Sequence, residues 1–391
     1  MNTNNHYQKI HIKDFLPHNI RLNLEKEFRT NLFNEAIQKA GTSAKDLAKE
    51  LGYQKNSINC WRRGATKPTF KDLLKILSYL NLNIEQIWNN IISFNSQGYN
   101  GHYELPSSFV LNEKLAWYFG YRDGDGSKAN PIIAACSSPK EIDLLLRYKE
   151  ITDELIKTSN KWSIYTYSIK SALVDKVKET FNNERIISYS KRQRKEGFVI
   201  LHIGGSKIND LFNNIEEKLD YFLGGASKKV QSEYAKGFFD ADGHVDIHGT
   251  IILRQSIKGV RRIKRVQMVL DNLNIRYKTK IRSSKFTLIV YSLKDYKEKI
   301  GFNSEIKKNQ LSKMIECYST PYNPTSIENR VYSLCDSPIT KRELMIKLKM
   351  RYGIMSTILN RMVNKHKLRV VLRRPFTVVN NQLKMNQELF Y

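Results

Sequence analysis

The stretch YAKGFFDADGHVDIHG, from Tyr234 to Gly249, holds two aspartates two residues apart, and a glycine follows them at once. Two histidines and a further aspartate then come at alternate positions. Such a cluster is typical of a metal site, of a calcium-binding loop, or of an ordinary helix that ends at a glycine. The rest of the chain distinguishes these three interpretations.

The same pattern occurs earlier in the chain, in LAWYFGYRDGDGS. Both copies read G-x-x-D-x-D-G, and their last aspartates, Asp125 and Asp242, are 117 positions apart. Each copy follows an apolar, helix-like run. Small residues recur four positions apart in each copy, at Gly120 and Gly124, and at Gly237 and Ala241. Small residues at this spacing share one helix face and allow two backbones to approach closely. We therefore expect two packed helices that bring Asp125 and Asp242 together at adjoining ends.

Two carboxylates at two helix C-termini repel each other and the helix dipoles, and divalent cations would relieve that repulsion. This arrangement suits metal-assisted phosphodiester hydrolysis, for which Mg²⁺ is the expected ion. An EF-hand calcium loop is disfavoured, because it needs acids at its first and last positions and both copies lack them there. A helix with a glycine cap explains one copy more readily than two copies at domain spacing.

The composition indicates a polyanionic partner. The chain has 391 residues, and 65 lysines and arginines against 38 acidic residues leave a net charge of +27. Double-stranded DNA is the expected partner, although charge alone also fits a ribosomal-type or membrane-surface protein. The four cysteines are isolated, so no CxxC zinc or redox spacing exists. The chain shows no signal-peptide pattern and no 18-residue apolar run, which predicts a cytoplasmic protein without a membrane span.

Both copies resemble the LAGLIDADG motif of homing endonucleases, over roughly residues 111–317. The resemblance implies an α+β fold with two pseudosymmetric αββαββα halves, whose motif helices meet and whose antiparallel sheets form a saddle on DNA. It also implies that Asp125 and Asp242 bind the metal and act in catalysis. The first copy departs from the family pattern at Arg122 and Gly124, where an apolar residue and alanine are usual. Two motifs in one chain make a monomer sufficient.

The segment GFNSEIKKNQL resembles the end of such a half, where a lysine near the active site is thought to organise water or stabilise charge. The resemblance implies this catalytic role for Lys307, with Lys308 as the alternative. A plain surface lysine also fits the pattern. The corresponding lysine of the first copy would be Lys228 or Lys229.

Basic and polar side chains in both halves are candidates for contacts with DNA. In RYKTKIR the cations fall at every second position, so a strand would carry them on one face, toward phosphates or toward solvent. The residues are Arg276, Lys278, Lys280 and Arg282. Alternation predicts one strand face for His244, Asp246 and His248, which either contact DNA or form a metal cluster. In the first half RIISYSKRQRK and GFVILHIGG predict a basic hairpin with Lys191, Arg192 and Arg194. A helix before WSIYTYSI is extra relative to the second half.

The region from Leu32 to Trp88 predicts a helix-turn-helix domain. Ser43 is a plausible N-cap, Gly52 supplies the turn, and Ile58 and Trp61 point inward from a second helix. The outward positions carry groups that read base edges, at Gln54, Asn56, Ser57, Asn59 and Arg62. The pattern resembles a Cro/repressor-type domain, and a helical protein-interaction domain is the alternative.

The C-terminal tail resembles a small winged helix, with RVVLRRPFTVV as its β-wing, and a basic interaction domain is the alternative. The expected organisation is a polar, loosely ordered tail (1–26), the helix-turn-helix domain (27–95), a linker (96–110), two nuclease halves (111–230 and 231–317), a second linker (318–329) and the winged-helix-like domain (330–391).

Taken together, these patterns predict a freestanding, site-specific double-strand DNA endonuclease that cuts a long asymmetric target with Mg²⁺. Two alternatives remain open. One is a DNA-binding regulator that reuses the nuclease scaffold without cutting, which the repressor-like domain favours and the two retained motif acids disfavour. The other is an RNA maturase that assists intron splicing.

Overall fold

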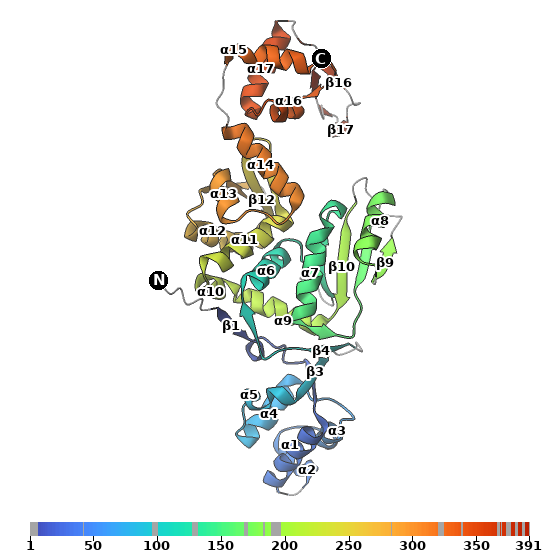
Figure 1. Ribbon diagram of the computed structural model, residues 1–391. Coiled ribbons are helices and arrows are strands. Elements are labelled where there is room, and N and C mark those ends of the chain that lie inside the picture. The colour runs from blue at the N-terminus through green and yellow to red at the C-terminus, as the bar shows by residue number, and fades with distance from the viewer. Residues whose placement is uncertain are drawn as a thin grey trace. The chain divides into compact units, whose positions relative to one another are not determined.

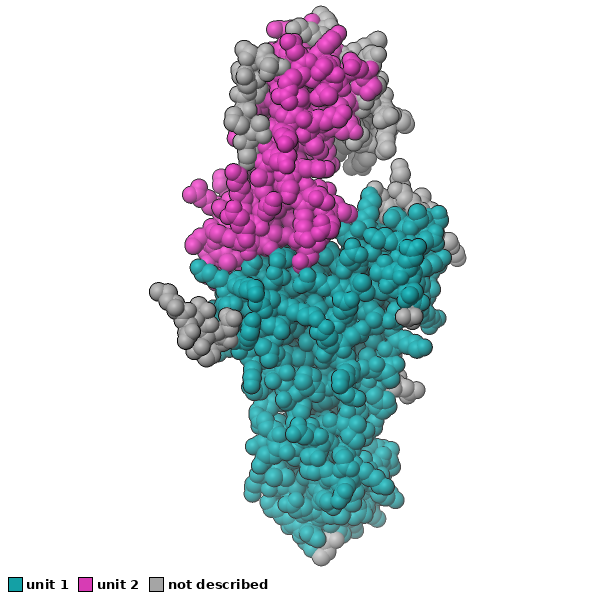
Figure 2. All heavy atoms as spheres, viewed as in Figure 1, with its two compact units in different colours: residues 1–241 teal, residues 242–391 magenta. Residues whose placement is uncertain are grey.

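The structure is a computed structural model. It describes residues 7–41, 43–95, 101–126, 132–167, 171–182, 184–188, 197–282, 284–319, 324–337, 339–365, 368, 370–372, 377–379, 382–384 and 388–390. The fold is α+β, with mainly antiparallel sheets. Two compact units divide the chain, residues 1–241 and residues 242–391 (Figure 2).

The N-terminal residues form strands where a loosely ordered tail was expected. Strand β1 (Gln8–His11) pairs with β5 (Ser108–Leu111). A second sheet has the order β2-β3-β4-β7 and consists of β2 (Arg21–Leu24), β3 (Ile91–Asn95), β4 (His102–Glu104) and β7 (Lys157–Thr158). The predicted tail and the predicted linker 96–110 are therefore wrong for these segments. Their apolar residues are few, but they recur every second position and are buried, as at Leu22 and Leu24.

A five-helix domain lies between β2 and β3. It consists of α1 (Lys26–Lys39), α2 (Ala44–Glu50), α3 (Ser57–Arg63), α4 (Phe70–Leu80) and α5 (Ile84–Ile87). Ser43 caps α2, because its side chain accepts the Asp46 N–H at 3.2 Å. Gly52 has a φ of 73°, which suits the turn between α2 and α3. Trp61 is buried, with its ring 4.9 Å from that of Tyr53. These three predicted features are confirmed.

The first half continues the same unit. Its elements are α6 (Glu113–Asp125), β6 (Ile132–Ser137), α7 (Ile142–Leu155), β8 (Ser163–Thr166), α8 (Ser171–Thr180), β9 (Arg185–Ser188), β10 (Val199–Gly204), α9 (Ser206–Glu217) and α10 (Leu219–Gly224). The second motif helix, α11 (Lys228–Asp242), follows. The sheet order is β6-β10-β8-β9, and β9 runs parallel to β8. The predicted hairpin of β9 with β10 is therefore wrong. Helix α8 supplies the long crossover that a parallel pair requires.

The second unit begins with an antiparallel sheet in the order β11-β12-β14-β13. Its elements are β11 (Gly243–Asp246), β12 (Thr250–Ser256), α12 (Val260–Asn272), β13 (Tyr277–Arg282), β14 (Lys285–Val290), α13 (Leu293–Lys299) and α14 (Glu305–Ser319). The predicted β13–β14 hairpin is confirmed. The sequence β12, α12, β13, β14 matches β6, α7, β8, β10 in connection and in strand order. The inserted elements of the first half are thus α8 and β9, and the prediction that the α7 helix is extra is wrong.

The C-terminal part of this unit has a core of its own. Val331, Leu344, Met355 and Leu359 are fully buried in one cluster. The elements are α15 (Pro324–Leu334), β15 (Ile339–Thr340), α16 (Lys341–Lys347), α17 (Tyr352–Asn364), β16 (Val370–Leu372), β17 (Thr377–Val379), β18 (Gln382–Lys384) and β19 (Glu388–Phe390). Sheet β15-β19-β16 flanks the helices, and β17 pairs with β18. The predicted linker 318–329 is partly helical, since α15 begins within it.

Candidate functional site

The two motif helices, α6 and α11, pack with their backbones in contact at two glycines. A Cβ atom added to Gly120 would lie 2.0 Å from the Tyr234 carbonyl oxygen, and one added to Gly237 would lie 2.1 Å from the Trp117 carbonyl oxygen. Any side chain at either position would therefore collide with backbone. The close packing predicted from the small residues is confirmed at these two positions.

The contacts between these helices are reciprocal. The Trp117 Nε1–H donates to Asp240 Oδ2 at 2.8 Å, and the Tyr234 hydroxyl donates to Asp123 Oδ2 at 2.8 Å. A shift of 117 positions converts one contact into the other. The helix pair thus uses the same surface on both sides, as a symmetric dimer interface does. Asp123 is 1% exposed and Asp240 is 2% exposed, so the inner acid of each motif serves the helix contact.

The last aspartate of each motif lies at the end of its helix. Asp125 and Asp242 are the final residues of α6 and α11, and each lies five positions after its crossing glycine. Cys136 Sγ donates to Asp125 Oδ1 at 3.7 Å. The Gln255 amide donates to the Asp242 carboxylate. Gln255 was missed in the sequence, although its strand TIILRQS returns alongside the strand that follows Asp242.

The electrostatic surroundings of Asp242 suit a bound cation. Burial raises the pKa of the Asp242 carboxyl, while Lys307, the Gln255 hydrogen bond and Arg262 act in the opposite direction. A partly buried carboxylate at a helix C-terminus is destabilised as an anion, and a divalent cation would stabilise it. The oxygen donors of Asp242 and Gln255 fit a hard cation such as Mg²⁺.

The structure distinguishes the two candidate lysines of α14. Lys307 is 8% exposed, and its charge lowers the pKa of Asp242. Lys308 is exposed, and its Nζ lies 2.6 Å from Glu305 Oε1. Lys307 is therefore the one of the two that can act at Asp242.

The candidate lysines of the first half lie at the wrong end of the motif helices. Lys228 and Lys229 begin α11, and Lys229 Nζ lies 2.9 Å from Oε1 of Glu113, the first residue of α6. Asp125 is at the opposite end of α6. The tentative assignment of either lysine to the first-half site is therefore wrong.

If Asp242 holds a metal ion for DNA cleavage, we expect Lys307→Met to reduce that cleavage by about 10²-fold or more, because it removes a buried cation beside this carboxylate. Lys308→Met, the adjacent control with the same chemistry, should stay within about threefold of the parent. Single-turnover cleavage of a saturated duplex measures both. Equal losses for the two variants would contradict the assignment.

We also expect Asp242→Asn to raise the melting temperature at pH 7 in EDTA. The folded state binds the Asp242 proton more readily than the unfolded chain does, so the free energy of unfolding falls as pH rises through the folded pKa. At neutral pH the charged form therefore costs stability, and the neutral amide removes that cost. Calorimetry between pH 4 and pH 8 should show a gain that shrinks toward acidic pH. A lower melting temperature at pH 7 would show that the partners of the carboxylate outweigh its burial.

One face of the second-half sheet carries exposed cations. Pairing aligns Lys280 with Thr287 and with Arg254 across β14, and Arg282 with Lys285. These residues, with Ile252 and Ile289, line a hollow of about 430 Å³. The predicted cations Arg276, Lys278, Lys280 and Arg282 are all exposed, and the last three share this face of edge strand β13. Arg254 and Lys285 were missed, although they stand at the matching alternate positions of their own strands.

The three polar residues after Gly243 do not share one strand face. His244 and Asp246 alternate with buried residues on β11, as predicted, but the strand ends at Asp246. His248 lies in the following turn, where its ring packs edge-on against Tyr352 at 4.9 Å. Burial and then Arg254 lower the pKa of His244. Among the residues that the structure describes, no group of three or more His, Cys, Asp or Glu could hold a metal ion.

The residues predicted to read bases in the helix-turn-helix domain differ in their exposure to solvent. Gln54 and Asn56 are exposed, whereas Ser57, Asn59 and Arg62 are partly buried. Arg62 Nη1 donates to Asn34 Oδ1 at 3.2 Å, so this guanidinium is turned toward α1. Arg63 is exposed beside it and was missed in the sequence. Lys191, Arg192 and Arg194 lie outside the described residues.

The departure of the first motif at Arg122 has a structural reason. Arg122 is fully buried, and its Nε lies 2.6 Å from Glu216 Oε1 on α9. Its Nη2 also donates to Asn209 Oδ1 at 2.6 Å and to Asn213 Oδ1 at 2.8 Å. The arginine thus ties α6 to α9 where the family usually has an apolar residue.

We expect Glu216→Ala to lower the free energy of unfolding by about 3–5 kcal/mol, because it leaves the buried Arg122 cation without its carboxylate. Glu154→Ala, which removes the partner of Lys114 in an exposed pair, should cost less than about 1 kcal/mol. Urea unfolding measures both. A small effect of Glu216→Ala would mean that Asn209 and Asn213 satisfy the arginine without it.

Comparisons with known proteins identify one part of the chain. A family model described as "Helix-turn-helix" matches residues 34–87, so the predicted helix-turn-helix domain is confirmed. The chain is also similar to DNA-directed RNA polymerase subunit Rpo1C of Methanocaldococcus jannaschii, with 23% identity over 227 residues. The match covers 55% of this chain and 25% of that protein, so the chain spans about a quarter of that relative's length.

Three solved structures resemble the chain at low scores. One is a point variant of homing endonuclease I-DmoI with its target DNA and manganese, at 16% identity and TM-score 0.34, over 51% of this chain and 98% of that chain. Another is full-length DUF199/WhiA from Thermatoga maritima, at 12% identity and TM-score 0.32, over 66% of this chain and 92% of that chain. The third is meganuclease I-SmaMI bound to DNA, at 12% identity and TM-score 0.28, over 52% of this chain and 88% of that chain. TM-scores below 0.5 do not establish a common fold.

No helix in the described part of the chain is both long enough and apolar enough to span a membrane.

Proposed function

We propose that this chain is a site-specific, metal-dependent double-strand DNA endonuclease of the LAGLIDADG type. The reciprocal contact of α6 and α11 carries the proposal. Crossing glycines, aromatic donors and inner aspartates all repeat at the same spacing, so one ancestral half, duplicated, accounts for both helices. The matching strand orders β6-β10-β8 and β12-β14-β13 support two related halves.

In this proposal Asp125 and Asp242 act together at adjoining helix ends. Asp125 and Asp242 would hold divalent cations there, which would supply Lewis acidity for hydrolysis of a phosphodiester. Gln255 orients the Asp242 carboxylate, and Lys307 supplies positive charge where negative charge develops in the transition state. Oxygen donors fit a hard divalent cation, and Mg²⁺ is the ion that we propose.

The cationic face of the second-half sheet is the proposed DNA surface. Lys278, Lys280 and Arg282, with Arg254 and Lys285, would contact phosphates, while His244 and Asp246 stand on the strand next to the scissile site. The helix-turn-helix domain adds a second DNA contact through Gln54 and Asn56. The order helix, strand, helix, helix, strand at the C-terminal end suits a winged helix that contributes a third.

A non-cleaving DNA-binding regulator is the second candidate, because the helix-turn-helix domain is the part of the chain that the comparisons identify. The pairing of two motif acids with Gln255 and Lys307 favours the nuclease. A buried lysine beside a partly buried carboxylate is an arrangement that active sites often use, although structural ion pairs use it too.

Selection by cleavage tests the proposal. The full chain is incubated with a randomised double-stranded DNA library and with genomic DNA, with Mg²⁺ or with EDTA, and the new ends are sequenced. Metal-dependent breaks at one long sequence are expected. Tight, sequence-specific binding without breaks under any divalent ion would favour the regulator.

A further inference from the structure

The helix-turn-helix domain is connected to the first half by a sheet and not by a simple linker. The strands that flank the domain in sequence, β2 and β3, pair with each other. Strand β3 pairs with β4 (Figure 1). Strand β4 in turn pairs with β7, which follows α7 of the first half. Both chain ends of the domain are therefore held by one sheet.

Side chains fasten this sheet to the nuclease half. The Tyr103 hydroxyl of β4 donates to the carbonyl of Gly204, the last residue of β10. Asn160 Nδ2 donates to the same carbonyl at 3.1 Å and also to the Tyr103 hydroxyl. Because Tyr103 is fully buried, these polar groups are costly to separate.

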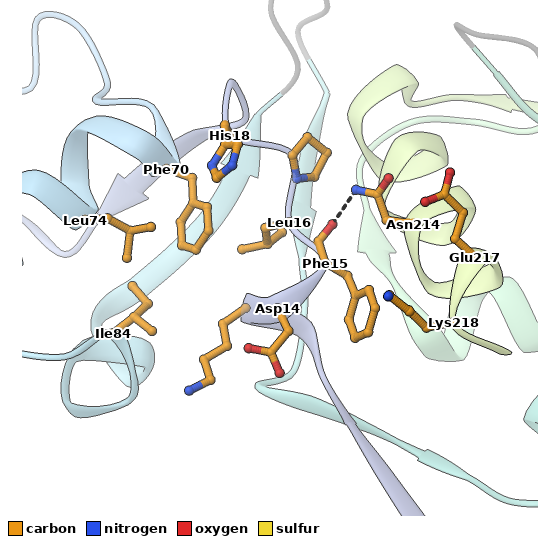
Figure 3. A pocket seen from close by; sticks show the side chains of 12 residues that line it. Asp14, Phe15, Leu16, His18, Phe70, Leu74, Ile84, Asn214, Glu217 and Lys218 are labelled. Carbon is orange, nitrogen blue, oxygen red and sulfur yellow. Dashed lines mark hydrogen bonds between the residues drawn. The ribbon is translucent and has the colours of Figure 1, made fainter. Parts of the chain in front are cut away.

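A second connection is the segment 12–20, here called the strap. On the nuclease side its Ile12 N–H donates to the Ser107 carbonyl at 3.0 Å, and its Phe15 carbonyl accepts from Asn214 Nδ2 of α9 at 2.8 Å. Figure 3 shows the second of these bonds, with the strap between α9 and the helical domain. The strap is thus held to the nuclease side by one backbone–backbone hydrogen bond and one hydrogen bond from a side chain.

On the other side the strap pairs with the helix-turn-helix domain. The Phe70 and Lys71 N–H groups at the start of α4 donate to the Ile20 and His18 carbonyls at 2.7 Å and 3.0 Å. Lys13 forms an ion pair with Glu85 of α5. A cavity of about 510 Å³ is bounded by the strap, by α4 and α5 through Phe70, Leu74 and Ile84, and by α9 through Asn214, Glu217 and Lys218 (Figure 3).

We propose that the helix-turn-helix domain reads a DNA subsite at one fixed distance and helical phase from the position of cleavage. The inference rests on the proposed nuclease function. Two domains on a flexible tether tolerate changes in site spacing, because loop-closure entropy varies slowly with length. Two domains that are held by a shared sheet and a strap cannot adjust to a change in site spacing. An inserted half-turn of DNA, about 5 base pairs, turns the subsite to the opposite side of the duplex.

The test uses a duplex that the full chain selects from a randomised library in EDTA. Bases whose protection is lost in Asn56→Ala define the helix-turn-helix subsite. Insertions of 5 and 10 base pairs are then placed between this subsite and the rest of the protected sequence, and the same insertions outside the subsite serve as controls. Both inner insertions should abolish protection of the subsite and weaken binding on the order of 10²-fold, and the outer insertions should do neither. Protection of the subsite at every spacing, with unchanged affinity, would overturn the inference.

A loosened variant distinguishes this failure from failure of the nuclease proposal. Flexible Gly-Ser segments are inserted at both chain crossings, after Leu24 and after Asn90, and Lys71→Pro with Glu85→Gln removes two of the bonds that α4 and α5 make to the strap. The variant should protect the subsite at the 10-base-pair spacing, and it should still cut a target that lacks the subsite as well as the parent does. If the parent cuts and its binding does not depend on the spacing, only the fixed distance between the helix-turn-helix subsite and the cleavage position is refuted. An absence of cutting by both proteins, with spacing-dependent binding, refutes only the nuclease.

Discussion

Replacing either Asp125 or Asp242 by asparagine should reduce Mg²⁺-dependent double-strand cleavage by at least about 10³-fold. Each carboxylate is the last residue of a motif helix, and an amide there is a much weaker ligand for a hard cation. Affinity for the target in EDTA should be retained or increased, because each change removes a negative charge near phosphates. This separation of binding from cutting is the strongest expectation from the site.

The measurement is single-turnover cleavage of the selected duplex, with binding measured in parallel in EDTA. Asp143→Asn is the matched control, since it makes the same charge change at an exposed position of α7 in the first half. It should stay within about twofold of the parent. Cleavage within tenfold of the parent for either motif variant would remove that acid from the proposed metal site. Loss of binding together with cutting would indicate a structural role instead.

Gly120→Ala and Gly237→Ala should each lower the free energy of unfolding by about 3 kcal/mol or more. The added Cβ would lie 2.0 Å from the Tyr234 carbonyl oxygen in one variant and 2.1 Å from that of Trp117 in the other. Both clashes are with helix backbone, which cannot swing aside as a side chain can, so the helices must separate. Because the contact is reciprocal, the two losses should be similar.

Gly224→Ala is the matched control, because this glycine is also in a helix and an added Cβ there meets nothing within 4 Å. The control should leave the free energy of unfolding unchanged or slightly raised, because Gly224 is the last residue of α10 and alanine is the better helix former. Guanidinium unfolding of all three variants gives the comparison. If Gly120→Ala behaved like Gly224→Ala, the close crossing of α6 and α11 would not exist in solution.

Local patterns in the sequence predicted the features that depend on near neighbours. The alternating cations of RYKTKIR indicated the exposed strand β13, and the cap at Ser43 with the turn at Gly52 indicated the helix-turn-helix domain. The duplicated G-x-x-D-x-D-G indicated close packing of two helices, which the glycine contacts bear out. In the first two cases the residues that indicate the structure lie close together in the sequence. In the third case the whole motif occurs twice.

Long-range pairing produced the errors. Strand β9 was assigned to the strand that follows it in sequence, but α8 carries it to the far side of β8. Short apolar alternations such as that of β2 were overlooked, because their partners lie some 70 residues away in β3. His248 looked like a strand residue, since alternation alone does not reveal where a strand turns.

The two acid-bearing motif helices, the helix-turn-helix domain and the strongly basic character follow from spacing, capping and charge, which can be read directly from the chain. The groups that surround those acids depend on how distant segments pack. This packing brought Gln255 and Lys307 to Asp242, paired the buried Arg122 with Glu216, and turned Arg62 toward Asn34. The physical reason is that desolvation and charge pairing depend on distance in space, and residues far apart in sequence become neighbours only when helices and strands pack.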